Sequence, residues 1–210
     1  MPDLHHVYHL YADGGWEQAW EEHIEALNLG LIGHLSTFSI GLVGSPENRA
    51  IARQCVENSG ATVVVEEDSG WEQVTLKWLH DQVATLDGFV LYCHSKGAGY
   101  PNGVSVPWRR TMTSDVVIGW EESVKLLDSY EAVGGHWHYP SDETGPVGYF
   151  AGNFWWARCE AIAELDEPEV IHRFAAEGWL GTNLEMNIMA LREGSFSASG
   201  PWDQGWITKP

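Results

Sequence analysis

Positive charge is scarce in this chain of 210 residues. The sequence has 11 Lys and Arg against 30 Asp and Glu, which gives a formal net charge of −19 at pH 7. No Lys or Arg precedes Arg49. A surface this negative repels nucleic-acid phosphates over most of its area, so the composition argues against DNA binding through a broad basic face.

Long apolar runs and paired cysteines are missing as well. No run reaches about eighteen apolar residues, and the start lacks a basic region followed by an apolar segment, so we expect no membrane span and no cleaved signal peptide. Cys55, Cys93 and Cys159 are scattered, without metal-type spacing. They favour a reduced setting, and we expect a cytoplasmic protein, in the host cytoplasm if it is viral.

Several catalytic signatures are also absent. The sequence has no phosphate-binding glycine motif of the dinucleotide or P-loop type, no Gly-x-Ser-x-Gly elbow and no His-Glu-x-x-His pair. The His-rich segments at 5–6 and 136–138 match no standard metal site. These absences argue against the corresponding classes of dehydrogenase, P-loop enzyme, hydrolase and metalloprotease.

Strand-like and helix-like patterns alternate through the first half. We expect Asp13 to cap the first helix and Ser45 the second. The regular β-α-β order requires right-handed crossovers, so the predicted fold class is α/β, one Rossmann-type domain with a mostly parallel sheet flanked by helices. The expected strands are 7–11, 38–43, 62–65 and 89–93, and the expected helices are 16–27, 45–58 and 72–86.

The second half is less regular. The pattern predicts a helix at 114–127, a short strand at 132–135 and a loop at 138–148. Residues 149–156 are expected to lead into a helix that ends at 165, and another helix is expected from about 168. The segment after 193 is expected to be a loop or a loosely held terminus.

The most informative segment is Gly88-Phe-Val-Leu-Tyr-Cys-His-Ser-Lys-Gly97. Its apolar run indicates a buried parallel strand that ends in His94 and Lys96, at the carboxyl edge where open α/β sheets bind ligands. Arg109 and Arg110 follow twelve residues later and complete the tightest group of cations in the chain. We therefore expect an anion there.

Each part of this segment suits a diphosphate. The Lys96 ammonium would act as a point charge, and the glycine-rich turn would let the ligand approach the backbone. Arg109 and Arg110 would add bidentate contacts to phosphate. In the alternative, Lys96 lies along apolar surface and the two arginines pair with acids such as Asp115.

Two further segments carry polar candidates. In Gly152-Asn-Phe-Trp-Trp156, Asn153 would bind a hydroxyl while a Trp forms a platform for a sugar or base; alternatively the aromatics are core and Asn153 caps a helix. Glu66-Glu-Asp68 would accept hydrogen bonds from a nucleoside or help to hold a cation, or it is a solvated helix start. Glu177 is a candidate general base, or it pairs with Arg173 on a helix.

Four segments resemble motifs of a glycosyltransferase family of the GT-A type, and the resemblance spans nearly the whole chain. Similar proteins are found in bacterial polysaccharide clusters and in bacteriophages, where some are associated with glycosylation of hydroxymethylated pyrimidines in DNA. The segments are Tyr92-Cys-His-Ser-Lys-Gly97, Trp108-Arg-Arg-Thr-Met112, Gly152-Asn-Phe-Trp-Trp-Ala157 and Arg173-Phe-Ala-Ala-Glu-Gly-Trp179.

This resemblance implies a hexosyl- or pentosyltransferase that takes its sugar from a nucleotide diphosphate, expected to be a uridine diphosphate sugar. The acceptor would be a hydroxymethylated pyrimidine in phage DNA or a surface glycan. Residues 1–100 would form the nucleotide-binding half, and residues 101–210 the acceptor and catalytic half. The alternative is a non-catalytic module that binds a nucleotide sugar or a glycan.

The resemblance also assigns roles to individual residues. Lys96, Glu177 and Asn153 would be catalytic, with Glu177 as the base. The substrate-binding residues would be Tyr11, Glu66, Asp68, His94, Ser95, Gly97, Arg109, Trp155 and Trp156.

The departure from the GT-A pattern is a missing Asp-x-Asp motif, which in most such enzymes holds a divalent cation against the leaving diphosphate. His94 and Lys96 stand at that strand end instead. Side-chain charge would then replace Mn²⁺ or Mg²⁺, or His94 would be a metal ligand. The absence of paired aspartates argues against a nucleotidyltransferase of another Rossmann-like class.

Overall fold

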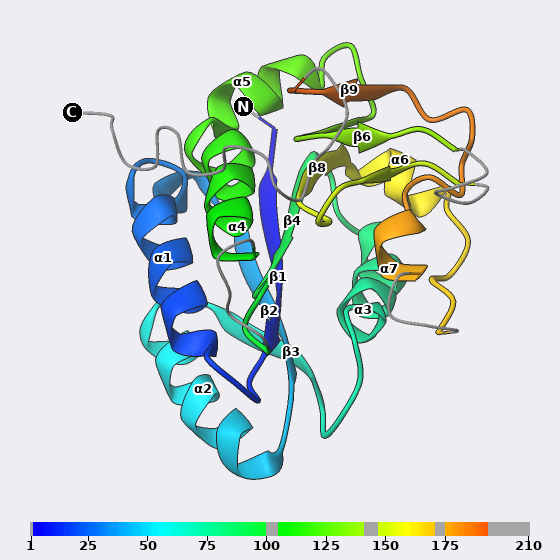
Figure 1. The fold of residues 1–210 in the computed structure, drawn as a ribbon. Coiled ribbons are helices and arrows are strands. Elements are labelled where there is room, and N and C mark those ends of the chain that lie inside the picture. The colour runs from blue at the N-terminus through cyan, green and yellow to red at the C-terminus, as the bar shows by residue number, and fades with distance from the viewer. Residues whose placement is uncertain (1, 100–104, 141–146, 171–174, 193–210) are drawn as a thin grey trace.

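A mixed seven-stranded sheet with the order β3-β2-β1-β4-β8-β5-β9 runs through the molecule (Figure 1). The computed structural model describes residues 2–99, 105–140, 147–170 and 175–192. Only β8 runs against its neighbours in this sheet, and a separate two-stranded ribbon pairs β6 with β7. The strands are β1 (Leu4–Tyr11), β2 (Thr37–Val43), β3 (Thr62–Glu67), β4 (Phe89–His94), β5 (Ala132–Gly134), β6 (Trp137–His138), β7 (Tyr149–Phe150), β8 (Trp155–Arg158) and β9 (Ile188–Ala190).

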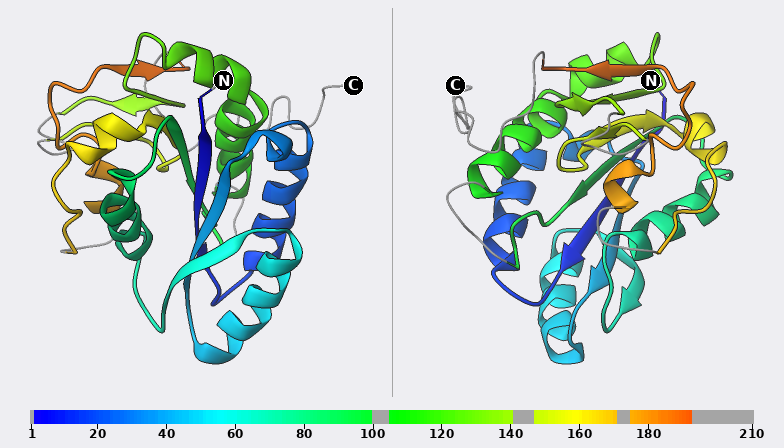
Figure 2. Two further views of the ribbon diagram at one scale, coloured as in Figure 1. Left: turned by 180° about the vertical axis from the view of Figure 1, so that it is seen from behind. Right: turned by 45° about the vertical axis from the view of Figure 1, so that its right-hand side comes forward.

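Helices cover both faces of the sheet, as Figures 1 and 2 show from three directions. The first face carries α1, α2, α4 and α5, and the second carries α3, α6 and α7. The helices are α1 (Trp16–Asn28), α2 (Pro46–Asn58), α3 (Gln73–Val83), α4 (Ser105–Thr113), α5 (Trp120–Leu126), α6 (Cys159–Ala163) and α7 (Ala175–Gly178), with a 3-10 turn η1 (Ile32–His34) and a π-helical turn η2 (Ser114–Ile118).

Strand β4 shows why the central strands are apolar throughout. Leu91 and Cys93 belong to the hydrophobic core under α1 and α2, while Val90 and Tyr92 belong to the core under α3. Successive side chains of a strand point to opposite faces, so a strand covered on both sides needs apolar residues at every position. This pattern confirms the predicted α/β class and places the carboxyl end of β4 inside the layered structure.

The elements predicted for the first half are confirmed, but the predicted cap of α1 is wrong. Gly15 stands at the N-cap, and the Asp13 side chain caps nothing there. Asp13 instead accepts hydrogen bonds from the Ser45 backbone N–H at 3.0 Å, from the Ser45 hydroxyl at 2.8 Å and from the Asn48 amide at 2.7 Å. Ser45 does occupy the N-cap of α2, although its side chain makes no capping bond. Asp13 therefore ties the end of β1 to the start of α2.

A helix does follow residues 149–156 as predicted, but it is shorter than expected, and the strand that precedes it was not predicted. Residues 155–158 form β8, between β4 and β5, and helix α6 begins only at Cys159. Trp155 packs into one core and Trp156 into the other, an alternation that only a strand at this place provides. The helix predicted at 114–127 is confirmed as η2 followed by α5. Residues 171–174 and the segment after 192 lie outside the described part of the chain.

None of the helices in the described ranges combines the length and the apolar character that a membrane crossing needs. The expected cytoplasmic location stays a prediction.

Candidate functional site

A cleft of about 940 Å³ opens at the carboxyl edge of the parallel strands. Tyr11 and Asp13 line it from the end of β1, Asp68 from the end of β3 and His94 from the end of β4. Its size is near the upper end of the range for small-molecule sites, roughly 300–1,000 Å³. Open parallel sheets bind ligands at this edge, so the cleft lies where the strand pattern predicted it.

A tight turn after β4 forms one wall of the cleft. The Ser95 N–H donates to the His9 carbonyl at 2.9 Å, and the Ser95 hydroxyl accepts from the Tyr11 N–H at 2.9 Å, so the turn is fastened to β1. Gly97 has φ +82°, and a Cβ there would lie 2.7 Å from the Ser105 hydroxyl. Only glycine satisfies both conditions, and the turn therefore holds Lys96 in a defined place.

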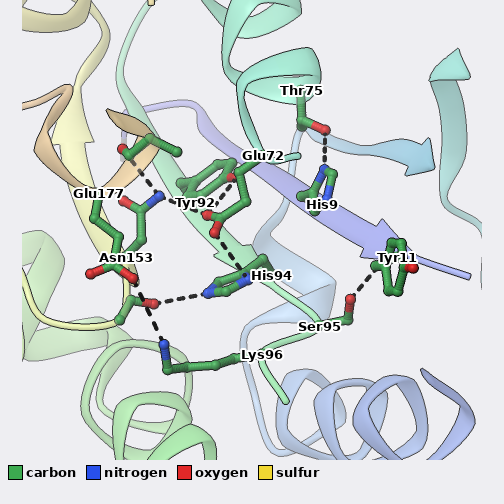
Figure 3. Close-up of polar contacts among 12 residues, drawn as sticks. His9, Tyr11, Glu72, Thr75, Tyr92, His94, Ser95, Lys96, Asn153 and Glu177 are labelled. Carbon is green, nitrogen blue, oxygen red and sulfur yellow. Dashed lines mark hydrogen bonds and ion pairs between the residues drawn. The ribbon is translucent and has the colours of Figure 1, made fainter. Parts of the chain in front are cut away.

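Lys96 faces a carboxylate across the cleft (Figure 3). Its Nζ lies 3.8 Å from the ring centroid of Trp108 and 3.9 Å from Oε1 of Glu177. The second distance is too long for a direct hydrogen bond, whereas the first is a close cation–π contact. Because the Trp108 ring carries no net charge, it orients the ammonium without neutralising it. Lys96 and Glu177, predicted from opposite halves of the chain, therefore share one cleft.

Glu72, which the sequence reasoning missed, lies at the centre of the polar network in Figure 3. Its Oε2 accepts hydrogen bonds from the Asn153 amide at 2.7 Å and from the Tyr92 hydroxyl at 3.2 Å. Its Oε1 lies 3.4 Å from Nδ1 of His94. Burial raises the pKa of the Glu72 carboxyl. These partners lie 20 to 81 residues away along the chain, so no local pattern could have found them.

The hydrogen bonds of His94 fix one of its protons. Nε2 lies 3.0 Å from the Gly152 carbonyl, and a carbonyl can only accept, so Nε2 carries a hydrogen. Nδ1 faces the Glu72 carboxyl, and a single proton can sit on either group. On Nδ1 it makes a His94 cation beside a Glu72 carboxylate, and on Glu72 it leaves both groups neutral. The two donors on Oε2 of Glu72 favour the carboxylate, whereas burial, the larger effect, favours the neutral acid.

The protonation state of the neighbouring histidine of β1 is set by burial. His9 also lines the cleft, and its Nδ1 lies 2.8 Å from the Thr75 hydroxyl. Burial lowers the pKa of His9 from 6.5 to about 4, although the nearby Glu72 opposes this. At neutral pH His9 is therefore uncharged.

The predicted catalytic contact of Asn153 with substrate is wrong. Its side chain is buried: Nδ2 also donates to the Ala176 carbonyl at 3.3 Å, and Oδ1 accepts from the Trp155 indole N–H at 2.7 Å. Asn153 has φ +58°, which places it in a left-handed turn before β8 and not at a helix cap. It positions Glu72 from below the cleft.

The substrate contacts predicted for Trp155 and Trp156 are wrong as well. Trp155 stacks on Tyr92 with ring centroids 5.2 Å apart, and the Trp156 indole N–H donates to the Val116 carbonyl at 2.7 Å. Both rings are fully buried, as the core alternative held.

Arg109 is buried and does not line the cleft, so its predicted contact with a diphosphate is wrong. It is 4% exposed, and its guanidinium donates to Glu22 at 2.8 Å and to the Lys96 carbonyl at 2.7 Å. Arg110 donates to the same carboxylate at 2.8 Å. Burial opposes ionisation of Glu22, but the hydrogen bonds from both arginines outweigh it and hold its pKa below the usual range. Neither arginine pairs with Asp115, which binds Arg192.

The two carboxylates predicted at the end of β3 differ in position, because Glu66 lies within the strand and Asp68 follows it. Glu66 pairs with Arg53 at 2.7 Å and is not among the residues that line the cleft, so its nucleoside contact stays a prediction. Asp68 does line it, while pairing with Arg49. The remaining predicted residues that line the cleft are Tyr11, His94, Ser95, Lys96, Gly97 and Glu177.

The donor set does not fit a protein-held divalent cation. Over the described ranges, no three His, Cys, Asp or Glu side chains gather as metal ligands would. His94 keeps one nitrogen protonated for Gly152 and faces Glu72 with the other. The steps proposed below therefore use no Mn²⁺ or Mg²⁺.

The α/β fold of this chain is similar to that of solved structures with very different sequences. A cytidylyltransferase from Leptospira borgpetersenii is similar over 91% of this chain and 76% of its own, with 8% identity and a TM-score of 0.52. A protein provisionally named a nucleotide-diphospho-sugar transferase, from Desulfovibrio desulfuricans, is similar over 91% and 80%, with 10% identity and a TM-score of 0.49. At 8% identity, the likeness to the cytidylyltransferase shows the fold alone.

The chain belongs to the family DUF8361, described as a domain of unknown function, whose model matches residues 17–191. No significant match was found among curated proteins.

Proposed function

We propose that this protein is a glycosyltransferase that moves a sugar from a nucleotide-diphospho-sugar, a uridine diphosphate sugar, to a hydroxyl acceptor. The observation that carries the proposal is the position of Lys96, held at the carboxyl end of β4 inside the cleft and facing Glu177. A cation and a carboxylate on one cleft supply the two charges that such a transfer needs.

Lys96 would stabilise the leaving group. As the bond between the sugar carbon and the phosphate oxygen breaks, its electron pair goes to the diphosphate, and negative charge grows there. A fixed cation in a partly dry cleft stabilises that charge more strongly than water does. The Trp108 ring keeps the Lys96 ammonium in place.

Glu177 would act as the base. The acceptor hydroxyl gives its proton to this carboxylate while its oxygen forms the new bond to the sugar carbon. Without a ligand, the Lys96 ammonium faces Glu177, whose oxygen lies 3.9 Å away. A diphosphate bound at Lys96 would pair with the ammonium in place of Glu177. Donor binding therefore releases the carboxylate for the acceptor.

A glycan hydroxyl suits the site better than a hydroxymethylated pyrimidine in DNA. DNA binding requires a basic strip on this acidic protein, and residues 96–110 were its candidate. Arg109 and Arg110 share the carboxylate of Glu22, which offsets one of their two charges, and Arg109 is buried.

The test is release of nucleoside diphosphate from a panel of sugar nucleotides. Wild-type protein should release it, Lys96→Ala should lower the rate at least about 100-fold, and Lys125→Ala should match wild type. Lys125 is a suitable control because its side chain is 75% exposed on α5, outside the cleft.

Other outcomes would overturn the proposal. Binding of a sugar nucleotide without turnover would identify a non-catalytic binding module. Release of pyrophosphate from nucleoside triphosphates would identify nucleotidyl transfer, and unchanged turnover in Lys96→Ala would remove Lys96 from the mechanism.

A further inference from the structure

The cleft has an apolar part that the proposed transfer chemistry does not use. Trp71 and Val170 line it and are 48% and 69% exposed. An aromatic ring of this kind buries roughly 150–250 Å² when it is covered, so a half-exposed ring that lines a cleft offers a ligand a large contact area. Trp71 is therefore a candidate ligand contact.

The backbone holds Trp71 at the mouth of the cleft while its neighbour reaches the floor. The Trp71 carbonyl accepts a hydrogen bond from the Val74 N–H at 3.1 Å, which starts the first turn of α3. Glu72, the next residue, has a side chain only 14% exposed, within the polar network. Adjacent residues thus supply a buried carboxylate and a half-exposed ring to the same cleft.

The chemical groups that line the cleft match those of a nucleoside diphosphate. Such a ligand has a flat ring at one end, ribose hydroxyls in its middle and an anion at the other end. The lining offers the Trp71 ring, the carboxylates Asp13 and Asp68, and the cation Lys96. The hydrogen bond from the Asn48 amide, with those from Ser45, lowers the pKa of Asp13, so this group is ionised and accepts from hydroxyls. The two carboxylates repel phosphate, which leaves Lys96 to bind it.

We infer that Trp71 is the stacking platform for the nucleobase of the donor. The inference rests on the proposed function, which makes the donor a nucleoside diphosphate sugar. Stacking uses the π-face that every base has, so Trp71 supplies affinity for the base and not its identity.

Calorimetric titrations with uridine diphosphate and with inorganic pyrophosphate test the inference. Trp71→Ala should weaken uridine diphosphate binding about 10- to 100-fold and leave pyrophosphate binding unchanged. Trp71→Phe should keep most of the affinity. Tyr139→Ala is the matched control, since Tyr139 is an aromatic 77% exposed and outside the cleft lining, and it should change neither titration.

Three results would count against the inference. Wild-type affinity of Trp71→Ala for uridine diphosphate overturns it, and so does an equal loss for both ligands, which indicates a distorted cleft. Neither outcome touches the proposed function if Lys96→Ala still loses pyrophosphate binding. If wild-type protein binds neither pyrophosphate nor any of the uridine, cytidine, guanosine and adenosine diphosphates, the proposed function and the inference both fail.

Discussion

Acid should destabilise this protein through histidines that the fold buries in their neutral form. His6 and His9, both on β1, are 0% and 3% exposed. Burial lowers the pKa of each from 6.5 to about 4. Between these values the unfolded chain binds protons that the folded chain excludes. The stabilising contribution is therefore complete above pH 6.5 and is lost as the pH falls toward 4.

The expected effect is large. A lowering from 6.5 to about 4 corresponds to roughly 3 kcal/mol for each histidine once the pH is below both values. Two such groups cost about 6 kcal/mol, which approaches the whole free energy of unfolding of an ordinary domain, about 5–15 kcal/mol. His23, whose Nε2 lies 2.7 Å from Nε2 of His6, adds to the loss because burial holds its pKa well below 6.5.

Urea unfolding at several pH values between 4 and 8 measures this effect. Comparison of wild type with His9→Gln gives the contribution of one histidine, because the variant cannot bind a proton at that position. Both proteins contain the same carboxylates, so the difference between their slopes cancels the acidic background. The variant's free energy of unfolding should fall less steeply with acid, by about 1.4 kcal/mol per pH unit near pH 5. His34→Gln, at an exposed histidine, should keep the wild-type slope. Equal slopes for His9→Gln and wild type would refute the reasoning.

Three further changes test the polar network and the turn. Asn153→Ala should lower the free energy of unfolding by about 2–4 kcal/mol in urea titrations, because it leaves the Trp155 N–H and Glu72 short of partners. A loss below about 0.5 kcal/mol, which surface substitutions also produce, would contradict this role. Glu72 has a raised pKa, so its contribution is present below about pH 4.5 and is lost as the pH rises through the folded-state pKa. Glu72→Gln should reduce the fall in melting temperature as the pH rises, because glutamine does not titrate. A melting-temperature profile equal to that of wild type would contradict this role of Glu72. Gly97→Ala should destabilise by more than about 1 kcal/mol and weaken pyrophosphate binding, and an unchanged affinity would show that the turn does not position Lys96.

The first four strands and three helices could be predicted because each carries its own periodic pattern. The end of strand β4 can be recognised because apolar residues change abruptly to His94 and Lys96. Because β4 runs parallel to β1, its end lies at the carboxyl edge of the sheet. The segment 155–158 could not be assigned this way. Its two tryptophans suit either a helix or a strand, and the choice depends on β4 and β5, which lie far away in the chain.

The sequence analysis predicted the candidate site correctly only where a charged residue follows the end of a strand, as Lys96 does after β4. Lys96 and Glu177 are brought to one cleft, but the sequence gives no sign that Glu22 lies against Arg109 and Arg110, 87 and 88 residues away. Glu72 was missed for the same reason, because its partners come from β4 and from the turn before β8, which are distant in the sequence. Long-range polar pairs of this kind are set by tertiary packing and leave no local spacing.

A crystal structure of the protein with a non-hydrolysable uridine diphosphate sugar tests the central claim most directly. The account predicts that a phosphate oxygen lies within hydrogen-bonding distance, about 3 Å, of the Lys96 ammonium, in the cleft at the end of β4. Phosphates bound elsewhere on the molecule, with Lys96 still facing Glu177, would contradict it.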